Sequence, residues 1–264
     1  MTPNNERLRI TFNEVAELYD QVRPGYPEAL FDAVVQLSGI PAQGRILEIG
    51  CGTGQATVPF ARRGYRIQCV ELGAEMAAVA RCNLLPYPDV SIYVGAFEQW
   101  PVEVEAFDLA FAATALHWID PVVGYPKLAQ ALKPGGALAV FGSEHVRVDE
   151  DGGIFGPIQQ VYDRETPEIS TDEPLLRPDE IADTSARVAA SGHFEVIATR
   201  RYVWSQAYDA ERYIQVLNTY SGHRTLTPDA RERLFRGITD IINQQEDKQI
   251  NKGYLTTLVV ARRR

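Results

Sequence analysis

The chain has 264 residues, of which 45% are hydrophobic, and it carries a formal net charge of −9 at pH 7. This length can bury one good core, so we expect a single domain with an elaboration. The acidic balance argues against a nucleic-acid partner, because nucleic-acid-binding surfaces normally need a basic face.

The N-terminal part of the chain is polar before it becomes periodic. Residues 12–19 are compatible with a short helix, and residues 19–27 form an aromatic and proline-rich segment. Apolar side chains then recur at helical spacing, which predicts a helix over residues 28–38.

The middle of the chain alternates between strand-like and helix-like patterns. Short apolar runs predict strands, and the intervening apolar periodicity predicts helices. The expected strands are 45–49, 66–70, 90–94, 107–112 and 137–141, and the expected helices are 53–63, 74–84 and 122–132. Pro59 lies inside one of these helices, close enough to its first turn to be tolerated. The alternation predicts a doubly wound α/β sheet.

The second half of the chain has fewer strands and more helices. Helices are expected at 154–165, 178–191, 210–219 and 228–243, and strands at 194–204 and 255–261. Pro228 follows Thr227, which is a typical arrangement at the first turn of a helix.

A glycine-rich motif directly follows the strand expected at 45–49. Gly50, Gly52 and Gly54 alternate with small residues there. Glycine suits a backbone that turns sharply and lets a ligand approach closely. The next strand ends at Glu71, and the ends of neighbouring parallel strands lie side by side. We therefore expect Glu71 beside the glycine loop, where a carboxylate suits the two hydroxyls of a ribose.

The glycine spacing helps to identify the nucleoside ligand. Dinucleotide-binding folds use G-x-G-x-x-G, whereas this chain has G-x-G-x-G. Glu48 precedes the first glycine by two residues, and we expect its carboxylate to repel a pyrophosphate and to pair with an ammonium group. An NAD-dependent oxidoreductase is thus disfavoured and stays an alternative.

The glycine motif resembles motif I of the class I methyltransferases that use S-adenosylmethionine (SAM). Further segments look like the small-molecule branch of that family, which includes trans-aconitate methyltransferases. These segments are Tyr19-Asp20-x-x-Arg23-Pro24-x-Tyr26-Pro27, Ala115-Leu116-His117-Trp118-Ile119-Asp120, Leu132-Lys133-Pro134-Gly135-Gly136 and Thr219-Tyr220-Ser221-Gly222-His223-Arg224. The resemblance implies a seven-stranded, mostly parallel sheet whose last strand is antiparallel. It also implies an N-terminal lid over residues 1–27 and a helical cap over residues 205–251.

The resemblance further implies SAM as the cofactor and assigns residues to its parts. The glycine-loop amides and Glu48 suit the methionine end, Glu71 suits the ribose, and small residues after the fourth strand leave room for the methyl group. Arg23 either lies near the SAM carboxylate or is a surface arginine. The expected cofactor-binding residues are Arg23, Glu48, Gly50, Cys51, Gly52, Thr53, Gly54, Gln55, Glu71, Leu72, Met76, Ala96, Phe97, Ala113, Thr114 and Ala115.

Methyl transfer is an in-line displacement at an activated carbon, so alignment of the acceptor supplies most of the rate. A general base is needed only for a poor nucleophile such as a hydroxyl. The candidates are His117, Tyr19 and His223, and the alternative for His117 is a structural stack with Trp118. The expected substrate-binding residues are Tyr26, Trp118, Tyr220 and Arg224, the last as an anchor for an acidic acceptor.

The remaining features concern compartment and partners. Three cysteines, Cys51, Cys69 and Cys82, form no C-x-x-C pair, which favours a reducing cytoplasm and no metal site. The N-terminus is polar and no run is long enough to cross a membrane. We therefore expect a cytoplasmic SAM-dependent methyltransferase of a small organic acceptor, with a carboxylate or a hydroxyl as the acceptor group. A SAM-binding protein without catalysis is a further alternative.

Overall fold

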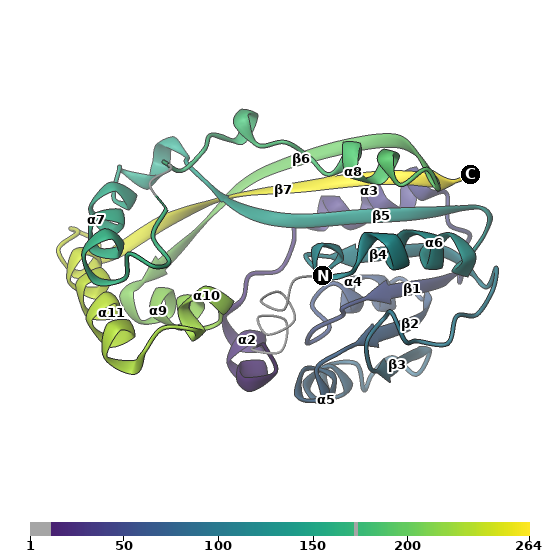
Figure 1. Cartoon of the computed structure of the whole chain (residues 1–264), viewed down its shortest axis with the longest axis horizontal. Helices are drawn as coiled ribbons and strands as arrows, with labels where there is room; N and C mark the ends of the chain where they lie inside the picture. Colours follow the sequence, from purple (N-terminus) through teal and green to yellow (C-terminus); the bar gives the residue numbers. More distant parts are fainter. Residues whose placement is uncertain (1–11, 172–173) are drawn as a thin grey trace.

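A computed structural model describes residues 12–171 and 174–264 of the chain. Its centre is a seven-stranded sheet with the order β3-β2-β1-β4-β5-β7-β6 (Figure 1). The strands are β1 (Arg45–Ile49), β2 (Arg66–Glu71), β3 (Val90–Val94), β4 (Phe107–Ala113), β5 (Leu132–Val146), β6 (Phe194–Asp209) and β7 (Gln249–Arg263). The first five strands pair in parallel, and β7 is antiparallel to both of its neighbours. The predicted mostly parallel sheet with an antiparallel last strand is confirmed.

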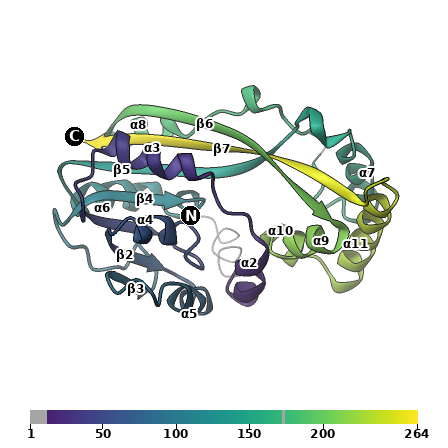
Figure 2. The same ribbon diagram turned by 180° about the vertical axis from the view of Figure 1, so that it is seen from behind.

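Helices cover both faces of the sheet. They are α2 (Ala16–Val22), α3 (Glu28–Ser38), α4 (Thr57–Arg62), α5 (Ala74–Asn83), α6 (Pro121–Ala131), α7 (Phe155–Glu165), α8 (Ser185–Ala190), α9 (Ala210–Asn218), α10 (Ser221–Arg224) and α11 (Pro228–Asn243). Side chains of α3, α4 and α5 form one buried layer, and those of α6 and α8 form the other. Figure 2 shows α3 and α4 in front of the sheet. No helix in the described part of the chain is long and apolar enough to span a membrane.

Strands β5, β6 and β7 are longer than the others and carry a second lobe beyond the parallel part of the sheet (Figure 1). We call this the cap lobe; it comprises α7, α9, α10, α11 and the adjoining ends of the three long strands. The cap lobe has its own hydrophobic core, which includes Ile158, Val161, Val216, Leu234 and Ile238. The carboxyl ends of β1, β2 and β4 face the space between the two lobes.

The long strands extend well beyond the predicted ranges of 137–141, 194–204 and 255–261. In β5 the extension pairs with β7, with Val146 opposite Gly253, and β6 pairs with β7 as far as Asp209 opposite Gln249. Local patterns missed these ends because they are held by partners distant in the sequence. The interval predicted as a cap, 205–251, therefore begins and ends in strand.

Two further predicted helices are shorter in the structure. The helix predicted at 53–63 begins only at Thr57, because Gly54 has a left-handed φ of 92° and still belongs to the loop. The helix predicted at 178–191 is a short turn at Pro178–Glu180 followed by α8. Of the segment predicted as a lid, residues 1–11 lie outside the described residues.

Candidate functional site

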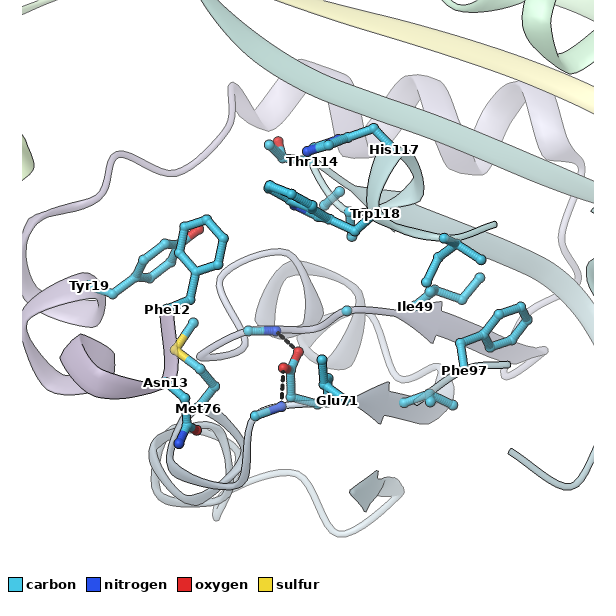
Figure 3. Close-up of a pocket in the computed structure, with 18 of the residues that line it drawn as sticks. Phe12, Asn13, Tyr19, Ile49, Glu71, Met76, Phe97, Thr114, His117 and Trp118 are labelled. Carbon is cyan, nitrogen blue, oxygen red and sulfur yellow. Dashed lines mark hydrogen bonds between the residues drawn. The ribbon is translucent and has the colours of Figure 1, made fainter. Parts of the chain in front are cut away.

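A cavity of about 350 Å³ opens at the carboxyl ends of β1, β2 and β4 (Figure 3). Most of its walls come from the loops that follow these strands. The remaining wall comes from α2, from the turn that precedes it, and from the start of α10. This is the edge of a parallel α/β sheet at which ligands commonly bind.

The glycine loop forms the floor of this cavity. Gly50, Gly52 and Gly54 have φ values of 68°, 56° and 92°, which other residues adopt only with strain. A Cβ at Gly50 would lie only 2.7 Å from the Cβ of Ala115. The glycines therefore permit both the turn and the close packing of the loop on the chain after β4.

Glu71, the last residue of β2, is fixed against this loop. Its two carboxylate oxygens accept hydrogen bonds of 2.8 Å from the backbone N–H groups of Gly52 and Gly73, which Figure 3 shows as dashed lines. The side chain lines the cavity although it is only 8% exposed. The structure thus places Glu71 beside the glycine loop, as the strand register predicts.

Glu48, which was predicted to bind the cofactor, lies outside the cavity lining. Successive strand residues point to opposite faces of the sheet, so Glu48 points away from the cavity toward α4. Thr57 Oγ1 donates a 2.6 Å hydrogen bond to it, and burial raises the pKa of Glu48 to about 8. It is fully buried and lines no part of the cavity. Since the carboxylate points away from the cavity, the argument against a dinucleotide depends on the glycine spacing.

Apolar side chains line the cavity on both sides of Glu71, with Met76 beside Asn13 and Phe97 on the opposite side in Figure 3. Leu72 and Met76 line one side, and Phe97 lines another, where it stacks on Trp100 with ring centroids 6.0 Å apart. Ala96, which was predicted to flank the ligand, does not line the cavity, whereas the neighbouring Gly95 does. The space between these side chains suits a flat apolar ring.

Arg23 joins the cavity to the cap lobe. Its guanidinium lies between the rings of Tyr19 and Tyr220, 5.0 and 4.2 Å from their centroids. Its Nε donates a 2.7 Å hydrogen bond to Thr219 Oγ1. The side chains of Arg23, Tyr19 and Tyr220 all line the cavity. Arg23 is therefore part of the cavity wall and not a free surface arginine.

Thr114, after β4, has a φ of 52°, which is unusual for a β-branched residue. Its hydroxyl lies 2.8 Å from the hydroxyl of Tyr26, and burial raises the pKa of Tyr26 above its usual value. Tyr26 itself does not line the cavity. The structure thus shows Tyr26, which was predicted to contact the substrate, behind the lining residue Thr114 and hydrogen-bonded to it.

His117 and Trp118 lie on the same side of the cavity as Thr114 in Figure 3. Their rings are in contact, with centroids 4.7 Å apart. Partial burial lowers the pKa of His117, and the charge of Arg187 lowers it further. The imidazole is therefore neutral at pH 7 and can accept a proton.

Several predicted residues are not brought to this cavity. The lining of the cavity does not include the loop residues Cys51, Thr53, Gly54 and Gln55. It also does not include His223 and Arg224. His223 Nε2 lies 2.6 Å from the hydroxyl of Tyr162 inside the cap lobe. Arg224 donates a 2.6 Å hydrogen bond to Glu14, so a carboxylate of the chain already occupies the predicted anchor.

Other lining residues were not predicted. They are Phe12, Asn13, Ile49, Val70, Gly73, Gly95, Ile119 and Ser221. Phe12 packs edge-on against Tyr19 and Trp118, with centroids 6.2 and 6.0 Å away. Asn13 Oδ1 accepts a 2.7 Å hydrogen bond from the backbone N–H of Glu75. No local pattern marks these two residues, because their partners are distant in the sequence. The described residues include no group of three or more His, Cys, Asp or Glu side chains that could hold a metal.

Part of the sequence is similar to known proteins. Residues 47–140 match a family described as a methyltransferase domain. An uncharacterized methyltransferase of Mycobacterium tuberculosis is 31% identical over 140 residues, which cover 53% of this chain and 55% of that protein. A malonyl-[acyl-carrier protein] O-methyltransferase of Herminiimonas arsenicoxydans is 30% identical over 161 residues, covering 60% of this chain and 59% of that one. The chain thus spans little more than half the length of these two relatives.

A solved structure extends the likeness of the fold to nearly the whole chain. A protein from Anaeromyxobacter dehalogenans, provisionally described as a type II methyltransferase, superposes with a TM-score of 0.61 and 22% identity. The match covers 92% of this chain and 97% of that one. The chain therefore matches a methyltransferase domain over residues 47–140 and has the α/β fold of the class I methyltransferases.

Proposed function

We propose that the chain is a SAM-dependent methyltransferase of a small organic acceptor. The observation that carries the proposal is the Glu71 carboxylate, held by the amides of Gly52 and Gly73 at the wall of the cavity. A fixed carboxylate beside a glycine loop suits the two hydroxyls of a ribose. The methyltransferase domain matched over residues 47–140 supports SAM as the nucleoside concerned.

The other walls of the cavity fit the remaining parts of SAM. Leu72, Met76 and Phe97 supply apolar surface for the adenine. Arg23, fixed by Thr219, supplies a cation for the carboxylate of the methionine moiety. The volume of about 350 Å³ is sufficient for one such ligand.

The residues of the chain align the acceptor and manage its proton. Bound SAM supplies a methyl group on a positively charged sulfur. Ala113, Thr114 and Ala115 present small side chains to the cavity, which leaves room for an acceptor atom to approach in line. The neutral His117 accepts the proton of a hydroxyl acceptor, whereas a carboxylate acceptor needs no base. The relative from Herminiimonas arsenicoxydans is named for O-methylation, which supports an oxygen acceptor.

Calorimetric titration with S-adenosylhomocysteine, the product of SAM after methyl transfer, tests the proposal. We expect saturable binding to the unaltered chain and no saturation with NADH. Glu71→Gln should weaken binding at least tenfold, because hydrogen bonds to a charged group contribute about 1.5–3 kcal/mol.

Glu75→Gln is the matched control, because Glu75 is an exposed acid on α5 outside the cavity and should leave the affinity unchanged. Absence of saturable binding to the unaltered chain would contradict the proposal. An equal affinity of the Glu71→Gln variant would contradict the assignment of Glu71 to the ribose. Tight binding without turnover across a broad panel of acceptors would favour the non-catalytic alternative.

A further inference from the structure

A second cavity, of about 230 Å³, lies inside the cap lobe. Tyr220 lines both this cavity and the first one, so it forms part of the wall between them. The second cavity is bounded by apolar side chains such as Phe155, Ile158 and Leu217, together with a few polar ones. A ligand that enters it lies next to the proposed cofactor site.

Lys252 is the most unusual residue of this second cavity. It is only 2% exposed, and its Nζ donates a 3.0 Å hydrogen bond to the hydroxyl of Tyr220. The rings of Tyr213, Tyr220 and Tyr254 surround the ammonium, with centroids 5.2–5.6 Å away. Aromatic rings attract a cation but carry no net negative charge.

No carboxylate of the described residues balances this charge. The lining contains no Asp or Glu in the part of the chain that the structure describes, and Lys252 forms no ion pair there. A buried ammonium without a counter-charge is costly. Among the described residues the ammonium has the Tyr220 hydroxyl as its partner and no counter-charge, so an anion would be favourable at this position.

The strand register explains why a lysine is buried at this position. Residues two apart in a strand share a face, so Ile250, Lys252 and Tyr254 all point toward the cap lobe. Ile250 and Tyr254 are members of its hydrophobic core. An apolar residue at position 252 would continue that core, so packing does not account for the lysine.

Two histidines of the same cavity each have one ring nitrogen without a hydrogen-bond partner among the described residues. His145 lies opposite Tyr254 in the pairing of β5 with β7. His145 Nε2 and His223 Nδ1 are buried and form no hydrogen bond with any described residue. Burial, followed by the charge of Lys252, lowers the pKa of His145 to about 2 and that of His223 to about 4. Both rings are therefore neutral at pH 7 and keep a nitrogen for hydrogen bonding to a ligand.

We propose that the second cavity binds the carboxylate of the methyl acceptor, with the Lys252 ammonium as its counter-charge. This inference rests on the proposed methyltransferase function and names its class of substrate, a small acid whose carboxylate is the anchor and whose methylated atom lies at the other end of a short apolar body. The apolar walls receive that body, and the acceptor reaches past Tyr220 to the cofactor site. One cation in an apolar lining matches a carboxylate better than the doubly charged phosphate.

Hexanoate and its uncharged isostere hexanamide are suitable probes, titrated by calorimetry into the chain saturated with S-adenosylhomocysteine. We expect hexanoate to bind at least tenfold more tightly than hexanamide. Lys252→Met should abolish that preference and should keep the affinity for S-adenosylhomocysteine within threefold. Lys248→Met, at an exposed lysine of the same lobe, is the matched control and should bind hexanoate like the unaltered chain.

The stability of the Lys252→Met variant is a second readout. If Lys252 serves ligand binding, the urea midpoint of the Lys252→Met variant should equal or exceed that of the unaltered chain. The reason is that the substitution removes an unbalanced buried charge. A lower midpoint together with unchanged hexanoate binding would assign Lys252 a structural role and overturn the proposal.

Two further outcomes would also overturn it. One is tighter binding of inorganic phosphate than of hexanoate. The other concerns Asp172 and Glu173, two acids that follow the lining residue Thr171 in the sequence. A gain in hexanoate affinity when Asp172→Asn and Glu173→Gln are combined would show that the chain itself supplies the counter-charge of Lys252. Since the affinity for S-adenosylhomocysteine is measured separately, a failure of the proposed function would be recognised as such.

Discussion

Two acidic residues of neighbouring strands show how position decides the chemistry of a single side chain. Glu71 ends β2, reaches the glycine loop and accepts two backbone hydrogen bonds at the cavity wall. Glu48, inside β1, points to the opposite face, and burial raises its pKa to about 8. The Glu71 carboxylate therefore faces the cavity, whereas the Glu48 side chain is buried away from it and is neutral near pH 7.

The raised pKa of Glu48 makes a testable statement about stability. The folded state holds the proton up to about pH 8, whereas the unfolded chain releases it near 4.5. This contribution is therefore fully present below pH 4.5 and is lost as the pH rises toward 8, by at most about 1.4 kcal/mol per pH unit. Glu48→Gln should remove the dependence.

Urea unfolding of both proteins at several pH values between 5 and 8 measures this difference. We expect the free energy of unfolding of the unaltered chain to fall relative to that of the Glu48→Gln variant across the range. A constant difference would mean that Glu48 is ionised in the folded protein.

At the scale of elements, the glycine loop joins β1 to α4. Its backbone is left-handed at Gly50, and the space beside it is filled by Ala115. Gly64 is also left-handed, with a φ of 80°, but a Cβ there would meet no atom within 4 Å. A substitution at Gly64 therefore tests backbone strain alone, whereas one at Gly50 tests backbone strain together with packing against Ala115.

We expect Gly64→Ala to lower the free energy of unfolding by about 1–2 kcal/mol, which is the cost of a left-handed alanine. Gly50→Ala should cost about 1–3 kcal/mol more, because the new methyl group overlaps Ala115. Urea unfolding of both variants measures the two costs. Equal losses would mean that the loop can move away from Ala115 freely.

The elements predicted to the residue are those whose limits are local. Residues 28–38, 45–49, 90–94 and 228–243 have these bounds in the structure, and Thr227 caps the last of them through a hydrogen bond from Ala230. The ends of β5 and β7 were missed because long-range pairing holds them.

The same reason applies to the site. A motif places Glu71, whereas the pairing of Arg224 with Glu14 and the burial of Lys252 depend on tertiary contacts.

At the scale of the whole molecule, the cavity for the proposed cofactor lies between two lobes that α2 holds together. Asn83 of α5 donates a 2.8 Å hydrogen bond to Asp20 of α2. On the other side, Arg212 of α9 donates one of 2.5 Å to the carbonyl of Gln21. A ligand in the first cavity therefore contacts the glycine loop, α2 and the cap lobe together, and Tyr220 connects it with the second cavity.

The most direct test of the central claim is a crystal structure of the chain with S-adenosylhomocysteine. The account predicts the ribose hydroxyls on the Glu71 carboxylate and the adenine between Met76 and Phe97. It also predicts the methionine carboxylate near Arg23 and the sulfur directed toward Thr114. A ligand bound away from the glycine loop, or with its ribose turned from Glu71, would contradict the account.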